Sequence, residues 1–214
     1  MDRQAFLARL APRPGLPVPQ APPRPGPAQG DLTEMLLTNL QAGGCGLHRA
    51  TGAQAALAAV LAIMKEAGVT RAGHAGLPPE MLEILPALAQ EAGLDMLHLP
   101  DGLEGAPALG EPLAAGLTVC EMAVAQTGGL VQLSGPQGGR LLSLLPPLHV
   151  ALLHASAILP DMAALAATLA DAGRFPQGPP ACALISGPSK TADIEGVMIR
   201  GVHGPGRVEV VLWS

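Results

Sequence analysis

The sequence predicts a single α/β domain with a β-hairpin inserted in its second half. Helical and strand-like segments alternate with short connections over about the first hundred residues after Asp31, a pattern typical of helices around a largely parallel sheet. Of the 214 residues, 49% are apolar, enough for a full-sized core. In the second half, two apolar runs flank a Gly-Gly pair, which is typical of a hairpin.

The N-terminal segment is distinct from this domain. Residues 1–10 can form a short amphipathic helix, and residues 11–30 contain eight prolines in twenty positions. Such a stretch favours an extended, flexible arm. An alternative is that a partner recognises the proline-rich segment. We therefore expect an arm over residues 1–30 and one α/β domain over residues 31–214.

The first helix of the domain has clear start and stop signals. Asp31 and Glu34 form a D-x-x-E start for a helix over residues 32–41, and Gly43 with Gly44 ends it. Thr51 predicts the cap of a second helix. The second helix is predicted over residues 52–68 and a third, which Pro86 should kink or split, over residues 78–93. Two strands are predicted over residues 68–73 and 94–100.

The second half predicts mainly strands. The hairpin occupies residues 120–135, with its turn near residues 126–129. After it we expect three further strands, over residues 148–155, 181–186 and 207–213. We also expect a helix over residues 161–173, and a loop that runs into a helix start over residues 187–196.

Charge and hydropathy exclude several classes of function. A net charge of −5 with scattered basic residues argues against a nucleic-acid surface. The apolar run over residues 141–159 approaches the length of a membrane span, but Pro146 and Pro147 would break a helix there, and two histidines would be stranded in lipid. The sequence therefore predicts no membrane span.

The cysteines and histidines show no metal-binding spacing. Cys45, Cys120 and Cys182 lie far apart, which indicates small buried hydrophobic residues in a reducing, cytoplasmic protein. The six histidines lack any HExxH-like pattern, so we expect no metal site. His149, inside an apolar run, is typical of a core histidine with a hydrogen-bond partner.

One loop has the character of an anion site. Lys190, one of only two lysines, follows Ser186, Gly187 and Ser189 between an apolar run and a predicted helix start, and Thr191 comes next. Backbone N–H groups and a positive charge at a helix N-terminus would suit a carboxylate or phosphate. A simple capped helix start explains the same residues equally well.

Three further places are candidates for ligand contact. Thr127, Gly128 and Gly129 would let a ligand approach the backbone, although a tight hairpin needs glycine for its own geometry. Arg140 is a candidate carboxylate clamp or a plain surface residue. His203 follows a strand-like run and precedes a turn, where a general acid or base could lie.

The two halves together resemble the LUD-domain family, in particular its lactate utilisation protein C group. The resemblance covers about residues 31–214, and its specific parts are "AVAQTGGLVQLSGPQGGRLLSLLPPLHVALL" and "ISGPSKTADIEGVMIRGVHGPGRVEVVL". It implies a Rossmann-like three-layer sheet of the ribose-phosphate isomerase and CoA-transferase type. The family hairpin usually reads E-T-G-T or E-T-G-S, whereas Gln126 and Gly129 stand here. Acid, base or nucleophile chemistry at position 126 would be lost, but hydrogen bonding would survive.

The resemblance also implies a role in the bacterial oxidation of L-lactate to pyruvate. Two sibling subunits would carry the iron–sulfur clusters, and this chain would bind no cofactor of its own. A small anionic ligand would occupy one cleft at the carboxyl edge of the sheet, lined by both glycine-containing corners and His203. Two alternatives remain open: a stand-alone enzyme acting on a phosphorylated sugar or acyl-CoA, and an assembly factor without a ligand.

Overall fold

A six-stranded parallel sheet forms the centre of the computed structural model, which describes residues 26, 28, 30–99, 113–133, 140–171, 181–191 and 199–214. The strand order is β1-β12-β7-β4-β2-β3, and every neighbouring pair is parallel. The strands are β1 (Gly46–Ala50), β2 (Arg71–Ala75), β3 (Asp95–His98), β4 (Ala115–Cys120), β7 (Leu148–His154) and β12 (Arg207–Trp213). The parallel sheet predicted from the alternation of elements is confirmed.

A second, four-stranded sheet lies beside the first and has the order β8-β5-β6-β9. Its strands are β5 (Met122–Val124), β6 (Gly129–Leu133), β8 (Ile158–Leu159) and β9 (Cys182–Ile185). Strands β5 and β6 are antiparallel, so the predicted hairpin is confirmed. Two further short strands, β10 (Lys190–Thr191) and β11 (Ile199–Arg200), pair with each other.

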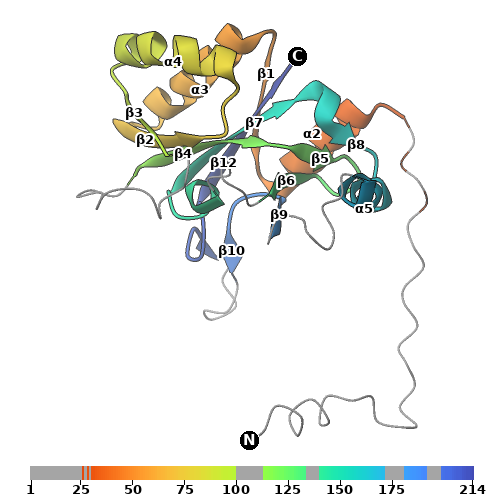
Figure 1. Ribbon diagram of the computed structural model, residues 1–214. Coiled ribbons are helices and arrows are strands. Elements are labelled where there is room, and N and C mark those ends of the chain that lie inside the picture. Colours follow the sequence, from red (N-terminus) through yellow and green to blue (C-terminus); the bar gives the residue numbers. More distant parts are fainter. Residues whose placement is uncertain are drawn as a thin grey trace, which may run out of the picture.

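The helices complete three layers around the central sheet (Figure 1). They are α2 (Leu32–Gly43), α3 (Ala53–Glu66), α4 (Pro79–Ala92) and α5 (Met162–Asp171), with the short 3-10 helices η2 (Arg140–Ser143) and η3 (Ala155–Ala157). Helices α3 and α4 cover one face of the parallel sheet, and α2 with the second sheet covers the other. The predicted three-layer α/β fold is confirmed.

Strand β12 shows why the parallel sheet is apolar on both faces. Val211 packs in the core beneath α3 and α4, whereas Val208 and Val210 pack against α2 and the second sheet. Successive side chains of a strand point to opposite faces, and helices or strands cover both faces here. A near-continuous apolar sequence is the expected result.

The start of α2 agrees with its predicted signal, but the start of α3 does not. Asp31 caps α2, since its carboxylate accepts hydrogen bonds from the backbone N–H groups of Thr33 and Glu34 at 2.8 and 3.2 Å. At α3 the cap residue is Gly52, without a side-chain hydrogen bond, so the cap predicted at Thr51 is wrong. The Gly52 N–H donates instead to the carbonyl of Ser214, which fixes the chain at a positive φ of 81°.

Two local predictions differ from the structure: the break at Pro86 and the loop at Lys190. Helix α4 continues as one element through Pro86. Lys190 and Thr191 form a strand rather than the approach to a helix, and residues 192–198, where the helix was expected, lie outside the described residues. So do the predicted N-terminal helix and nearly all of the proline-rich arm.

None of the helices in the described part of the chain is long and apolar enough to cross a membrane.

Candidate functional site

Two segments that are distant in the sequence, residues 126–129 and 186–190, meet at the last turn of α2. The Asn39 side-chain amide donates to the carbonyls of Ala125 and Gln126, at 2.8 and 3.2 Å, which fixes the β5–β6 turn against the helix. The Gln126 amide in turn donates to the carbonyl of Gly26 at 3.0 Å. We call the assembly of residues 39–44, 126–129, 186–190 and 201–206 the glycine junction.

Glycines allow the backbones of the glycine junction to touch. A Cβ atom added at Gly128, whose φ is 63°, would lie 2.9 Å from the carbonyl carbon of Asn39. A Cβ atom added at Gly187 would lie 2.6 Å from the Gly43 carbonyl oxygen, and one at Gly43 would collide with the carbonyl of Ser186. No side chain fits at these contacts, so the close approach of the backbones requires glycine at each of these positions.

Lys190 contacts the end of α2. Its Nζ atom donates a hydrogen bond to the Gly43 carbonyl at 2.6 Å, and its side chain is exposed. The carbonyl end of a helix carries partial negative charge, so a lysine there is favourable. The helix expected to begin after Lys190 falls on residues outside the described ranges, and the helix terminus that Lys190 contacts is the C-terminus of α2.

The loop that carries His203 wraps around Ser189. The Ser189 N–H donates to the carbonyl of Pro205 at 2.9 Å, and the Gly201 N–H donates to the Ser189 carbonyl at 3.0 Å. A Cβ atom at Gly204 would lie 3.3 Å from Ser189 Cβ. His203 itself is exposed, so its imidazole is accessible beside the glycine junction.

The antiparallel pairing of β6 with β9 joins the two predicted corners. Leu130 lies opposite Ile185, and a Cβ atom at Gly129 would lie 3.7 Å from Ser186 Oγ. Thr127 and Ser186 are exposed there. The structure thus brings together eight of the predicted residues: Thr127, Gly128, Gly129, Ser186, Gly187, Ser189, Lys190 and His203.

The two remaining candidates lie in other contacts. Thr191 follows Lys190 in β10 and pairs with Ile199. Arg140 opens η2, which packs against β4, and its carbonyl accepts a hydrogen bond from the buried Ser143 hydroxyl at 2.8 Å. Arg140 is therefore part of a short helix that packs against the parallel sheet.

The glycine junction lies at the amino ends of the parallel strands, and the predicted carboxyl edge is wrong. Gly43 and Gly44 precede β1, and Pro205 precedes β12. In Figure 1, β9 and β10 lie at the end of the molecule opposite the C-terminus. The reason is that β9 pairs antiparallel with β6 in the second sheet, so its carboxyl end does not share the direction of the parallel strands.

The carboxyl ends of β1, β7 and β12 surround a cavity of about 320 Å³. Arg49 and Trp213 contribute to its wall. The Arg49 guanidinium is paired with Glu34, with 2.5 Å between Nη2 and Oε1. None of the predicted site residues lines this cavity.

A buried carboxylate near the glycine junction is absent from the predicted set. Glu209 is only 6% exposed. Its Oε2 lies 2.8 Å from His48 Nε2, and its Oε1 accepts a hydrogen bond from Arg207 Nε at 2.7 Å. The pKa of Cys45 is raised to about 11, first by burial and then by Glu209, whereas Lys190 opposes the rise. The signal in the sequence is an acid inside an otherwise apolar strand.

His149 is a core residue, as predicted, but only one of its ring nitrogens is paired. It is fully buried, and its Nε2 lies 2.9 Å from Thr118 Oγ1. Its Nδ1 has no hydrogen-bond partner in the described ranges. Burial lowers its pKa to about 4, so the ring is neutral near pH 7.

The cysteines divide between core and surface. Cys45 and Cys120 are buried, as predicted, whereas Cys182 is exposed, and all three are free thiols. Among the residues that the structure describes, no three His, Cys, Asp or Glu side chains form a group that could hold a metal ion.

Comparison with known proteins places this architecture in a family. The sequence profile of the LUD domain matches residues 33–213, nearly the whole of the described fold. The chain belongs to the LUD domain family. The two corners of the glycine junction therefore lie within the LUD domain.

Relatives and a solved structure agree with this assignment. The chain is 38% identical over 127 residues to YkgG, an uncharacterised Escherichia coli protein, covering 59% of this chain and 54% of YkgG. It is 42% identical over 98 residues to lactate utilization protein C of an Exiguobacterium strain, covering 45% of this chain and 43% of that protein. The matches thus span about half the length of these relatives.

The solved structure shows the fold alone. It is the crystal structure of a DUF162 family protein from Deinococcus radiodurans, with a TM-score of 0.58 and 22% identity, covering 86% of this chain and 96% of that chain. The shared fold thus extends over most of this chain.

Proposed function

We propose that this chain takes part in lactate utilisation and binds a small carboxylate, lactate or pyruvate, at the glycine junction. Relatives named lactate utilization protein C support the pathway. What supports the site is the backbone contact of the 126–129 and 186–190 segments with the end of α2, where Lys190 donates to Gly43. Thr127, Ser186 and His203 are exposed on these segments and on the adjoining 201–206 loop.

The chemistry of these groups suits a hydroxy acid. A lysine ammonium has three N–H donors, of which Lys190 directs one to the Gly43 carbonyl. The remaining donors would bind the carboxylate, and the Ser186 hydroxyl would donate a further hydrogen bond to it. The Thr127 hydroxyl would exchange its 3.4 Å contact with the Val124 carbonyl for another. His203, exposed on its loop, would accept the proton of the substrate hydroxyl.

The redox part of the reaction belongs to partners in this proposal. Oxidation of lactate to pyruvate releases a pair of electrons and a pair of protons. We assign the electrons to iron–sulfur clusters on two sibling proteins. The role of this chain is then to hold the carboxylate and take up the hydroxyl proton, and the proton from the broken C2–H bond leaves with the partner that accepts the electrons.

The two lysines of the chain allow a matched test of the binding site by calorimetric titration with L-lactate. Lys190→Gln keeps a hydrogen-bond donor for the Gly43 carbonyl but removes the charge. A hydrogen bond to a charged group contributes about 1.5–3 kcal/mol, so we expect lactate affinity to fall roughly 10-fold to 100-fold.

Lys65→Gln is the control, because Lys65 is exposed in the last turn of α3, outside the glycine junction. We expect it to bind lactate as the unchanged protein does. Equal affinity in all three proteins, or no binding to the unchanged protein, would remove the carboxylate site from the glycine junction.

A further inference from the structure

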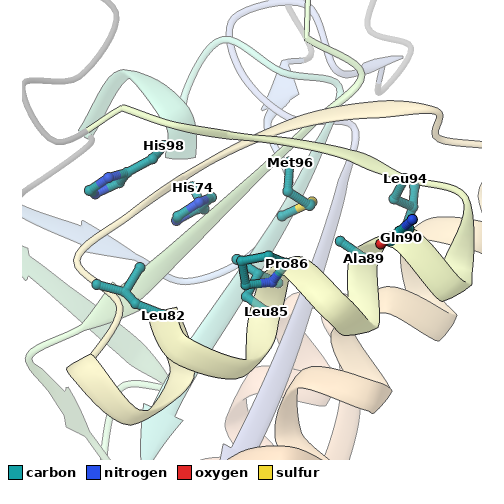
Figure 2. Close-up of a pocket in the computed structure, with 9 residues that line it drawn as sticks. All are labelled: His74, Leu82, Leu85, Pro86, Ala89, Gln90, Leu94, Met96 and His98. Atoms are coloured by element: carbon teal, nitrogen blue, oxygen red, sulfur yellow. The ribbon is translucent and has the colours of Figure 1, made fainter.

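A second hollow lies between helix α4 and the edge of the parallel sheet formed by β2 and β3 (Figure 2). Its volume is about 560 Å³, within the range of small-molecule sites. Helix α4 supplies Leu85, Pro86 and Ala89, and β3 supplies Met96. The walls are therefore mainly apolar, and none of the glycine junction residues contributes to them.

A stacked pair of histidines closes one end of this α4 cavity. His74 of β2 and His98 of β3 lie opposite each other in the parallel register. Their ring centroids are 4.9 Å apart and their planes differ by 8°. His98 is exposed, so the pair extends from the interior to the surface (Figure 2).

His74 is the unusual member of the pair because it is buried without a partner. It is only 4% exposed. Its imidazole makes no hydrogen bond within the described ranges, and its Nδ1 atom is fully enclosed. Burial, and then His98, lower its pKa to about 4, so it is a neutral ring with one N–H donor and one acceptor. Nε2 is not among the enclosed atoms, so a molecule in the cavity would reach the ring there and form a neutral hydrogen bond of about 1 kcal/mol.

The lining also restricts the charge of an occupant. Among the described residues of the wall, the Gln90 amide is the only polar side chain besides the two histidines, and none is Lys, Arg, Asp or Glu. An ion would lose its water without gaining an opposite charge, which is unfavourable. An uncharged occupant avoids that cost.

We propose that the α4 cavity binds a small, uncharged, mainly apolar molecule whose hydroxyl or amide group hydrogen-bonds to His74. The apolar body of the molecule would lie along Leu85, Ala89 and Met96. This ligand differs in charge from the carboxylate proposed for the glycine junction, so the two sites are tested independently.

Methyl NMR with labelled methionine tests this site through Met96, which lies in the cavity wall. The probes are benzyl alcohol and toluene, which differ by one hydroxyl group, and benzoate, which carries a charge. We expect saturable shifts of the Met96 methyl signal with benzyl alcohol. Its affinity should be about fivefold higher than that of toluene, the value of one neutral hydrogen bond, and benzoate should bind least.

Two variants connect the preference to the cavity. His74→Phe keeps a ring of similar size but removes both polar atoms, so benzyl alcohol and toluene should bind alike. Ala89→Leu should fill the cavity and abolish binding of both. Ala87→Leu is its matched control, since Ala87 is exposed on the same helix outside the cavity wall.

Three results would overturn the proposal. They are no saturable Met96 shift in the unchanged protein, no preference for benzyl alcohol over toluene, and an unchanged preference in His74→Phe. The first result would mean that the cavity holds only water. Should Ala89→Leu lose its folded spectrum, the comparison with His74→Phe decides the question.

Discussion

Burial keeps His74 and His149 in the neutral form, and this makes the stability of the protein depend on pH. The pKa of each is lowered from 6.5 to about 4. Below pH 6.5 the unfolded chain takes up protons at these histidines while the folded chain does not. The free energy of unfolding should therefore fall as pH falls from 6.5 towards 4, by up to about 1.4 kcal/mol per pH unit for each histidine.

Urea unfolding between pH 7 and pH 5 measures this dependence. His149→Asn should lower stability at pH 7, because it disturbs the hydrogen bond to Thr118. It should also reduce the slope of stability against pH. An unaltered slope in His149→Asn would show that burial does not lower the pKa of this ring.

Residue-level predictions from the sequence succeed where the signal is local. His149 is recognisable as a core residue because apolar neighbours surround it in the sequence. Its partner Thr118 lies 31 residues away on another strand, and no local pattern indicates that contact. The same limit applies to Glu209, whose partner His48 lies 161 residues earlier in the sequence, on the neighbouring strand β1.

At the scale of elements, the end of α2 is fixed by backbone contact with the 186–190 segment. In a helix, alanine is favoured over glycine by about 1 kcal/mol, so Gly43→Ala should stabilise an isolated α2. In the folded protein the added methyl collides with the carbonyl of Ser186. We therefore expect Gly43→Ala to lower the free energy of unfolding by about 1–3 kcal/mol, measured by urea unfolding.

Gly93→Ala is the matched control for this substitution. Gly93 ends α4 at a φ of 72°, and nothing lies within 4 Å of an added Cβ atom. Its cost is backbone strain alone, about 1 kcal/mol. If Gly43→Ala proved more stable than the unchanged protein, the close approach of α2 to the 186–190 segment would be wrong.

Helix and strand signals in the sequence predict most elements, but they do not predict the contacts with distant residues that fix the ends of those elements. The Asp31 cap is correct because it involves only the next three residues. The predicted Thr51 cap fails because a distant carbonyl, that of Ser214, holds Gly52 in the cap position. Lys190 lies in a strand because residues 190–191 pair with residues 199–200, a contact that short-range propensity does not encode.

At the scale of the whole molecule, the parallel sheet is predictable and the edge that carries the glycine junction is not. Alternation of helix and strand predicts the sheet wherever it occurs. The edge depends on which sheet β9 joins, and that is decided by pairing between residues 130–133 and 182–185. The rule that ligands bind at the carboxyl ends of parallel strands leads to the cavity beside Trp213, whereas the predicted residues meet at the opposite edge.

A crystal structure determined with L-lactate present tests the central claim most directly. The claim is that residues 126–129 and 186–190 meet on the end of α2 to form a carboxylate site. We expect the lactate carboxylate within hydrogen-bond distance of Lys190 Nζ, with the Gly43 contact retained. Lactate bound only in the cavity beside Trp213, or only in the α4 cavity, with the glycine junction empty, would contradict the account.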